Sequence, residues 1–306
     1  MMYKRILMAL DSQGHSTDLL AQARSLARTT GAALHLLMII PLTASALLEC
    51  LADDIAALET QAYRFLDDMA TWLGREGITT STEVRLGDPV MTVLTTAQNM
   101  GADALALPTP WRIGGRIIAA DISQRLLYRV PLPVLIGRLE CWWPTTCRHL
   151  LVPIDFGVTT AFTLRSALAL AHWHQAHVTV LHILPPSKAT LVVDMDHISA
   201  DTVALVVEEQ HIEAQERLTA MLKSMHAGWI HPQVVTGEPI AEIVKAAVRL
   251  RTDLVVMGSR GQCGLWRFLG QNITAEVARH TPCPVLVVKA PARTAQQLPP
   301  RFQAHL

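Results

Sequence analysis

The stretch that decides the fold is Asp253-Leu-Val-Val-Met257-Gly258-Ser-Arg-Gly261-Gln-Cys-Gly264. It begins with a short apolar run and continues with three glycines in seven residues. A short run that is apolar throughout is typical of a strand buried on both faces of a parallel sheet. Glycines directly after such a strand let backbone N–H groups approach phosphate oxygens closely. The stretch therefore predicts a buried strand followed by a candidate phosphate-binding loop.

The same pattern occurs twice in the chain, in two copies that align almost without gaps. Asp253–Met257 repeats Asp103–Leu107, and Leu150–Asp155 repeats Ile6–Asp11. The period of about 145–150 residues is far longer than that of a solenoid repeat, so each copy is expected to be a complete domain. We predict a first domain at 1–138, a second at 147–290 and an irregular tail at 291–306.

Within the second copy, short apolar runs alternate with longer segments of helical period. The predicted strands are 150–154, 178–184, 231–236, 254–257 and 285–288, and the predicted helices are about 160–174, 199–227, 239–250 and 270–280. Apolar strands separated by helices indicate an α/β fold with helices on both faces of the sheet. We therefore predict two tandem doubly wound domains, each an open five-stranded and mostly parallel sheet. Ligands of such sheets bind outside the carboxyl ends of the strands, where the strand order switches.

Composition excludes several classes of protein. The 306 residues include 26 acidic and 26 basic side chains, a balance that argues against nucleic-acid binding. No apolar stretch reaches the roughly 18–20 residues of a spanning helix. The apolar run near the N-terminus stops at Asp11, which favours a first strand over a signal peptide. Five cysteines without a C-x-x-C pair fit a reducing, cytoplasmic setting.

Two smaller clusters have alternative interpretations. Cys141 and Cys147 flank the linker at 137–148, where a disulfide is the alternative to two reduced thiols. The histidines at 172, 174, 177 and 182 lie close in sequence, but no cysteine or carboxylate lies at ligand spacing beside them. Surface and strand positions are therefore favoured over a metal site, and no metal ligands are predicted.

These motifs together resemble the universal stress protein domain. The resemblance is carried by Leu151–Asp155, Gly237-Glu-Pro239, Asp253–Gly261 and Arg279–Val288, and it covers nearly all of both halves. The chain is thus similar to a tandem universal stress protein. Nucleotide-binding members of that family carry Gly-x-x-Gly, nine residues, and then Gly-Ser or Gly-Thr. Gly258 and Gly261 match the first pair, whereas Gln271-Asn272 stands where the second is expected.

The resemblance implies an adenine-nucleotide site in the second half, for ATP, ADP or AMP, with Mg²⁺ carried by the nucleotide. It places Asp155 at the adenine and ribose edge, Ile183 as a backbone partner of adenine, and Pro153 against the base. The complete predicted set is Pro153, Asp155, Ile183, Met257, Gly258, Arg260, Gly261, Gly264, Gln271 and Asn272. The Asn272 amide can replace a serine hydroxyl, while the Gln271 side chain can fill the phosphate space. The alternatives are that Asp155 is only a turn acceptor and the glycines only end the strand.

The first half is predicted not to bind nucleotide. Pro108 and Pro110 each remove a backbone N–H where a phosphate loop needs donors. Trp111 takes the position of Gly261, and Asp121, aligned with Asn272, would place a negative charge beside phosphate. Three separate changes therefore oppose binding in this copy.

Three functions remain open at the level of sequence. No Walker, Gly-x-Ser-x-Gly or His-Glu-x-x-His motif occurs, so at most slow ATP hydrolysis is expected. The first hypothesis is a stress-response regulator that binds an adenine nucleotide in its second domain and signals through a protein partner. The alternatives are an interaction protein independent of nucleotide and a weak ATPase. The resemblance also implies a pseudo-dimer in which Val134–Ile136 pairs antiparallel with Val285–Val288, and a homodimer of chains is possible.

Overall fold

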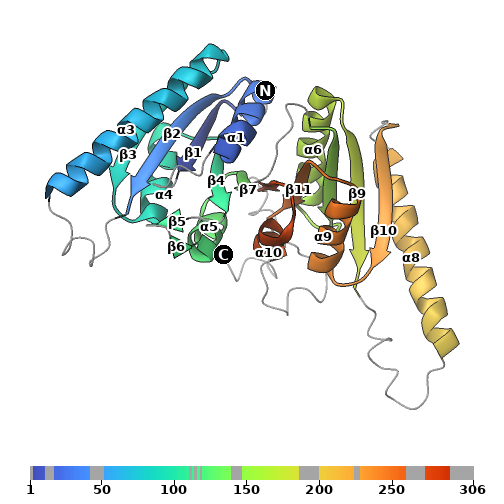
Figure 1. Cartoon of the computed structure of the whole chain (residues 1–306). Helices are drawn as coiled ribbons and strands as arrows, with labels where there is room; N and C mark the ends of the chain where they lie inside the picture. The colour runs from blue at the N-terminus through green and yellow to red at the C-terminus, as the bar shows by residue number, and fades with distance from the viewer. Residues whose placement is uncertain are drawn as a thin grey trace. The chain divides into compact units, whose positions relative to one another are not determined.

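The computed structural model describes residues 3–10, 17–41, 52–109, 112–113, 116–117, 119–138, 147–185, 200–223, 228–259 and 273–289. These residues divide into two compact units, each shown within Figure 1. The first unit contains the described residues of 3–138 together with 283–289, and the second contains those of 147–282. None of the described helices is long and apolar enough to cross a membrane.

The first unit is built on a parallel sheet with the strand order β3-β2-β1-β4-β7. Its strands are β1 (Arg5–Leu10), β2 (Ala33–Ile40), β3 (Thr80–Leu86), β4 (Ala104–Thr109) and β7 (Val134–Arg138). Its helices are α1 (Thr17–Thr30), α3 (Ala52–Arg75), α4 (Pro89–Met100) and α5 (Ala119–Arg129). A short antiparallel pair, β5 (Arg112–Ile113) and β6 (Arg116–Ile117), precedes α5.

The second unit repeats this arrangement with the order β10-β9-β8-β11, and its paired neighbours are parallel. Its strands are β8 (His149–Ile154), β9 (His177–Leu184), β10 (Ile230–Thr236) and β11 (Leu254–Gly258). Its helices are α6 (Thr160–His174), α8 (Ala200–Lys223), α9 (Pro239–Arg249) and α10 (Ile273–His280). The predicted α/β class, with mostly parallel strands and alternating helices in both units, is confirmed.

The cores lie around the central strands because those strands are buried on both faces. In β9, consecutive residues from Val178 to Leu181 are all buried, although successive side chains point to opposite faces of the sheet. Helices therefore cover both faces of the sheet. β10 is mostly exposed and contains Pro232, which cannot donate a ladder hydrogen bond. A proline there fits the described position of β10 at a sheet edge.

One further strand, β12 (Val285–Val288), belongs to the first unit although it lies in the second sequence copy. It pairs antiparallel with β7, with Val285 opposite Ile136 and Val287 opposite Val134. The Lys289 ammonium then donates to the backbone carbonyl of Leu127 in α5. The antiparallel pairing expected for these two segments is confirmed. It covers the edge of β7, which would otherwise present unpaired backbone groups.

The repeated Gly-acid-Pro motif begins the helix after each third strand. Asp88 Oδ1 accepts a hydrogen bond from Met91 N at 2.8 Å, and Glu238 Oε2 accepts one from Ala241 N at 2.7 Å. Each carboxylate therefore satisfies an N–H group that has no partner within its helix. The proline that follows occupies the first helical turn, where its missing N–H does no harm.

A second repeated carboxylate joins the start of the first strand of each copy to the start of the fourth. Asp103 Oδ2 accepts from the backbone nitrogens of Lys4 and Arg5, at 2.8 and 2.9 Å. Asp253 Oδ2 does the same for Arg148 and His149, at 2.7 and 2.9 Å. These bonds hold the amino ends of two neighbouring strands together in both copies.

We predict that Asp103→Ala lowers the free energy of unfolding by about 1–2 kcal/mol, because two N–H groups lose a charged acceptor. Urea denaturation of the full chain measures the change. Asp67→Ala is the matched control, since Asp67 is exposed on α3, and its effect is expected to stay within about 0.5 kcal/mol. Equal effects of the two variants would contradict the structural role of Asp103.

Candidate functional site

The candidate site lies where the strand order of the second unit reverses. β9 follows β8 in the chain and lies on one side of it, while β11 lies on the other side. The carboxyl ends of these three parallel strands therefore share one edge. Asp155 directly follows β8, Ile183 is next to last in β9, and Gly258 ends β11. Residues far apart in the sequence thus meet at the position where doubly wound sheets bind ligands.

The described members of the predicted set differ in what they can present to a ligand. Pro153, Ile183 and Met257 are buried, whereas Asp155 and Gly258 are partly exposed. Pro153 lies opposite Leu181 within the ladder of β8 and β9. Among these residues, Asp155 therefore presents a polar side chain at the edge. The ends of β9 and β11 can present backbone N–H and C=O groups.

Asp155 shapes the turn from β8 into α6. Its Oδ1 accepts a hydrogen bond from Gly157 N at 2.8 Å and from Thr160 Oγ1 at 3.5 Å. Between them, Phe156 adopts a left-handed backbone conformation with a φ of 56°. This conformation is sterically costly for a residue with a side chain, so the turn needs local hydrogen bonds to hold it. Asp155 is therefore a turn acceptor, and a role toward nucleotide would be additional.

Gly258 is a glycine because the chain packs too closely there for a side chain. A Cβ atom at this position would lie 2.4 Å from Thr159 Oγ1, at the start of α6. The Gly258 carbonyl accepts a hydrogen bond from Thr274 Oγ1 in α10, at 3.3 Å. The first unit has the same bond, from Ser123 Oγ in α5 to the Pro108 carbonyl at 3.1 Å. The end of β11 is thus held against the first turns of two helices.

Three side chains, those of Phe156, His182 and Arg217, form a cluster at the same edge. This cluster was not predicted from the sequence. The Phe156 and His182 rings lie 4.4 Å apart, and the Arg217 guanidinium lies 4.3 Å from the Phe156 ring centroid. His182 Nδ1 lies 2.9 Å from the Ile154 carbonyl. Phe156 and His182 are each next to a predicted site residue in the sequence, and this adjacency was the sequence feature that could have indicated them. Arg217 comes from α8, and no sequence spacing connects it to them.

Burial lowers the pKa of the His182 imidazole below its usual 6.5. The Arg217 charge acts in the same direction, while the hydrogen bond to Ile154 and the Asp155 charge partly oppose it. His182 is accordingly biased toward its neutral form beside Asp155. The three histidines that lie near His182 in sequence are not at this edge. His177 begins β9 at the opposite edge, and His172 and His174 lie in the last turn of α6.

The remaining predicted residues lie outside the described part of the chain. These are Arg260, Gly261, Gly264, Gln271 and Asn272, together with Cys141, Pro110 and Trp111. Their assignments stay predictions, as does the proposed charge of Asp121 beside phosphate. The described structure therefore contains the adenine and ribose half of the predicted site, and the predicted phosphate loop follows it in sequence.

The pattern of strands and turns matches a known family twice. The model of the universal stress protein family matches residues 2–138 and 146–289. The chain belongs to the universal stress protein family. Both of its halves are therefore universal stress protein domains, in tandem.

Relatives and solved structures agree with this assignment. A universal stress protein of Bacillus subtilis is 29% identical over 147 residues, which are 46% of this chain and 97% of the relative. Another, from Methanocaldococcus jannaschii, is 39% identical over 92 residues, 29% of this chain and 54% of the relative. The crystal structure of a universal stress protein from Archaeoglobus fulgidus matches with a TM-score of 0.71 at 19% identity, covering 94% of this chain and 97% of that one. At this identity the likeness shows the fold.

We predict that Gly258→Ala lowers the free energy of unfolding by about 1–3 kcal/mol, because the added methyl overlaps Thr159. Gly228→Ala is the matched control, since a Cβ there would have no heavy atom within 4 Å. Adding Thr159→Ala to Gly258→Ala should recover part of the loss, and denaturant unfolding of the three variants measures this coupling. A Gly258→Ala variant as stable as Gly228→Ala would contradict the packing.

We also predict that the His182 imidazole titrates below its usual pKa of 6.5, in the direction set by its burial. NMR titration of the ring protons measures the midpoint directly. The unfolded chain then takes up the proton before the folded chain as the pH falls. The free energy of unfolding therefore decreases with falling pH below about 6.5, and His182→Gln makes this decrease smaller. A midpoint at or above the usual value would refute the assignment.

Proposed function

We propose that the second domain binds an adenine nucleotide at the carboxyl edge of β8, β9 and β11, and that binding regulates contact with a protein partner. The observation that carries the proposal is the meeting of Asp155, the backbone of Ile183 and the backbone of Gly258 at the strand-order switch. This edge presents a carboxylate acceptor for ribose hydroxyls and backbone groups for the base. ATP, ADP and AMP share both features.

The first turns of α6 and α10 support the phosphate part of the proposal. Both helices begin beside the end of β11, through Thr159 and Thr274. The N-terminus of a helix carries unpaired N–H groups and a partial positive charge, which favour a bound phosphate. In the predicted loop, Gly258 and Gly261 supply the backbone approach, Arg260 supplies charge, and Asn272 supplies an amide donor. Gln271 is proposed to limit the space available to the phosphate groups.

Regulation follows if two states of the protein differ in nucleotide affinity. A nucleotide can shift a conformational equilibrium only by its differential affinity for the two states. The Phe156, His182 and Arg217 cluster links the candidate site to α8, whose residues Leu205 and Ile212 are exposed apolar side chains. A change at the site can thus reach a surface suited to a protein partner.

Mg²⁺ would arrive with the nucleotide, near Asp155, and any hydrolysis would be slow and incidental. The setting we propose is the cytoplasm.

One observation favours a second candidate, an interaction protein that works without nucleotide. Asp155 is already engaged in the turn through Gly157 and Thr160, so its position has a structural explanation. Under this alternative the domains provide partner-binding surfaces during stress and the carboxyl edge is only part of the fold. The two candidates differ in whether nucleotide binds at all.

Isothermal titration of the full chain with ATP and with AMP tests the proposal. We expect saturable binding of one site per chain. Asp155→Ala should weaken it by about 10- to 150-fold, the loss of a hydrogen bond to a charged group. Asp11→Ala is the matched control, because Asp11 holds the same position in the first copy, and its affinity should equal that of the wild type.

Gly261→Trp is the second variant, because it copies the first domain and leaves the Asp155 turn untouched. It should abolish binding while the thermal unfolding midpoint stays unchanged. The reverse change, Trp111→Gly, should not create a second site, since Pro108 and Pro110 remain. Absence of heat at millimolar ATP and AMP would reject the nucleotide proposal in favour of the interaction protein. Unchanged binding by Gly261→Trp would show that the site is misplaced.

A further inference from the structure

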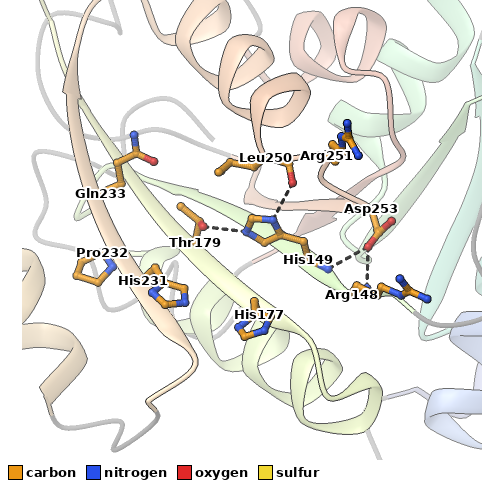
Figure 2. Close-up of a pocket in the computed structure, with 10 residues that line it drawn as sticks. All are labelled: Arg148, His149, His177, Thr179, His231, Pro232, Gln233, Leu250, Arg251 and Asp253. Atoms are coloured by element: carbon orange, nitrogen blue, oxygen red, sulfur yellow. Dashed lines mark hydrogen bonds between the residues drawn. The ribbon is translucent and has the colours of Figure 1, made fainter.

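A cavity of about 810 Å³ lies at the opposite, amino edge of the second unit (Figure 2). It is bounded by the starts of β8, β9 and β10 and by the residues that follow α9. In Figure 2, His231 lies on one side of this space, His149 lies near its centre with His177 below it, and Arg148 and Arg251 lie at the other side. The volume is within the range of about 300–1,000 Å³ that is typical of small-molecule sites.

The floor of the cavity is polar, and its polar side chains already have hydrogen-bond partners. His149 Nδ1 lies 3.0 Å from the Leu250 carbonyl, and its Nε2 lies 2.9 Å from Thr179 Oγ1. Asp253 Oδ2 accepts the backbone N–H groups of Arg148 and His149. Among the described residues that line the cavity, the one carboxylate is therefore bonded to the backbone, so its charge is partly compensated before any ligand arrives.

Cationic and imidazole side chains remain around this floor. Arg148, Arg251, His177 and His231 are all exposed. The rings of His177 and His231 face each other with centroids 5.9 Å apart. Arg251 and Arg148 come from different elements, one after α9 and one before β8. Groups that can donate hydrogen bonds to an anion thus surround the cavity from four sequence segments.

The first domain provides an internal control for the backbone at this edge. Gly101 occupies the position of Arg251, and both residues are left-handed, with φ values of 60° and 49°. Glycine adopts this conformation without steric cost, whereas for arginine the conformation is sterically costly. In the first domain, the Arg5 guanidinium lies 2.9 Å from the place of a Cβ on Gly101 and so fills that space. In the second, His149 replaces Arg5 and is shorter, and the arginine comes from the end of the helix instead.

The same comparison shows a change of charge. At the positions that line the cavity, the first domain has Lys4 and Arg5 against Glu83 and Asp103, a formal charge of zero. The second has Arg148 and Arg251 against Asp253, a formal charge of plus one, because Gln233 replaces Glu83. His177 and His231 stand where the first domain has Ala33 and Ser81. Each of these replacements makes the second edge more favourable for an anion.

We propose that this cavity binds a small multivalent oxyanion, a phosphate- or carboxylate-bearing metabolite, through Arg148, Arg251, His177 and His231. Guanidinium groups form paired hydrogen bonds to phosphate and to carboxylate alike, so both share the recognition chemistry. The site lies at the opposite ends of the strands from Asp155. Six residues of β9 separate His177 from Ile183, which is about 20 Å at about 3.3 Å per residue. It is therefore independent of the nucleotide proposal, and either can fail without the other.

The test is NMR of the histidine side chains in the full chain, titrated at constant pH with inorganic pyrophosphate and, separately, with citrate. We expect saturable shifts of the His177 and His231 ring signals, while those of His182 at the carboxyl edge stay in place. Saturation by pyrophosphate and not by citrate assigns the site to phosphorylated compounds, and the reverse result assigns it to polycarboxylates. Non-saturable shifts with both anions would overturn the proposal, as would shifts confined to His182.

Arg251→Gly is the decisive variant, because it restores the residue of the first domain and relieves the backbone. It should weaken anion binding by about tenfold, the contribution of one charged hydrogen-bond donor. Gln175→Gly is the matched control, since Gln175 is also left-handed, with a φ of 53°, and does not line the cavity. Its affinity should equal that of the wild type. Unchanged binding by Arg251→Gly, or equal losses in the two variants, would overturn the role of the arginine.

Discussion

The constraint on which the structure depends is burial of the first strand of each domain between two parallel neighbours. All residues of β1 from Ile6 to Leu10 are inaccessible to solvent, and β8 is buried from Leu150 to Ile154. A strand with so little polar surface needs a neighbour on each side and helices on both faces. Right-handed crossovers then place the second strand on one side and the fourth on the other. Both edges of interest in the second domain follow from this, since parallel strands place their carboxyl ends at one edge of the sheet and their amino ends at the other.

The two domains share their packing devices and differ in their polar edges. Asp103 and Asp253 make the same two backbone bonds, and Ser123 and Thr274 make the same bond to the fourth strand. Side chains that hold the fold together are thus repeated in chemistry as well as in position. The substitutions that change charge or bulk fall at strand ends, where the fold tolerates them. Such a distribution fits two copies that kept one architecture while the side chains at their strand ends diverged.

Much of the fold could be predicted from the sequence because its signals are local. Apolar runs and helical periods placed α6 at its observed bounds, and the repeat gave the predicted strands of one copy counterparts in the other. The positions of Asp155 and Gly258 at one edge followed from parallel topology alone. The stacking of Arg217 on Phe156 could not be predicted, because it depends on the rotation of α8 over the sheet. The amino-edge cavity was also missed, although the pairing of Arg5 with Gly101 and of His149 with Arg251 was readable in the aligned copies. Predicting the cavity required the three-dimensional contact in which the Arg5 guanidinium fills the place of a side chain on Gly101.

The structure also changes which glycine carries information about a ligand. Gly258 has a sufficient explanation in its contact with Thr159, which would exclude a side chain with or without nucleotide. The first domain accommodates Pro108 at the same position and keeps the hydrogen bond to its carbonyl. A glycine that is explained by its contact with Thr159 cannot by itself indicate that the domain binds a ligand. The distinction therefore passes to the next glycine, Gly261, where the first domain has Trp111. Exchanging Gly261 keeps both Gly258 and Thr159, the two residues of that contact, in the sequence. It therefore separates the two functional candidates better than an exchange of Gly258 can.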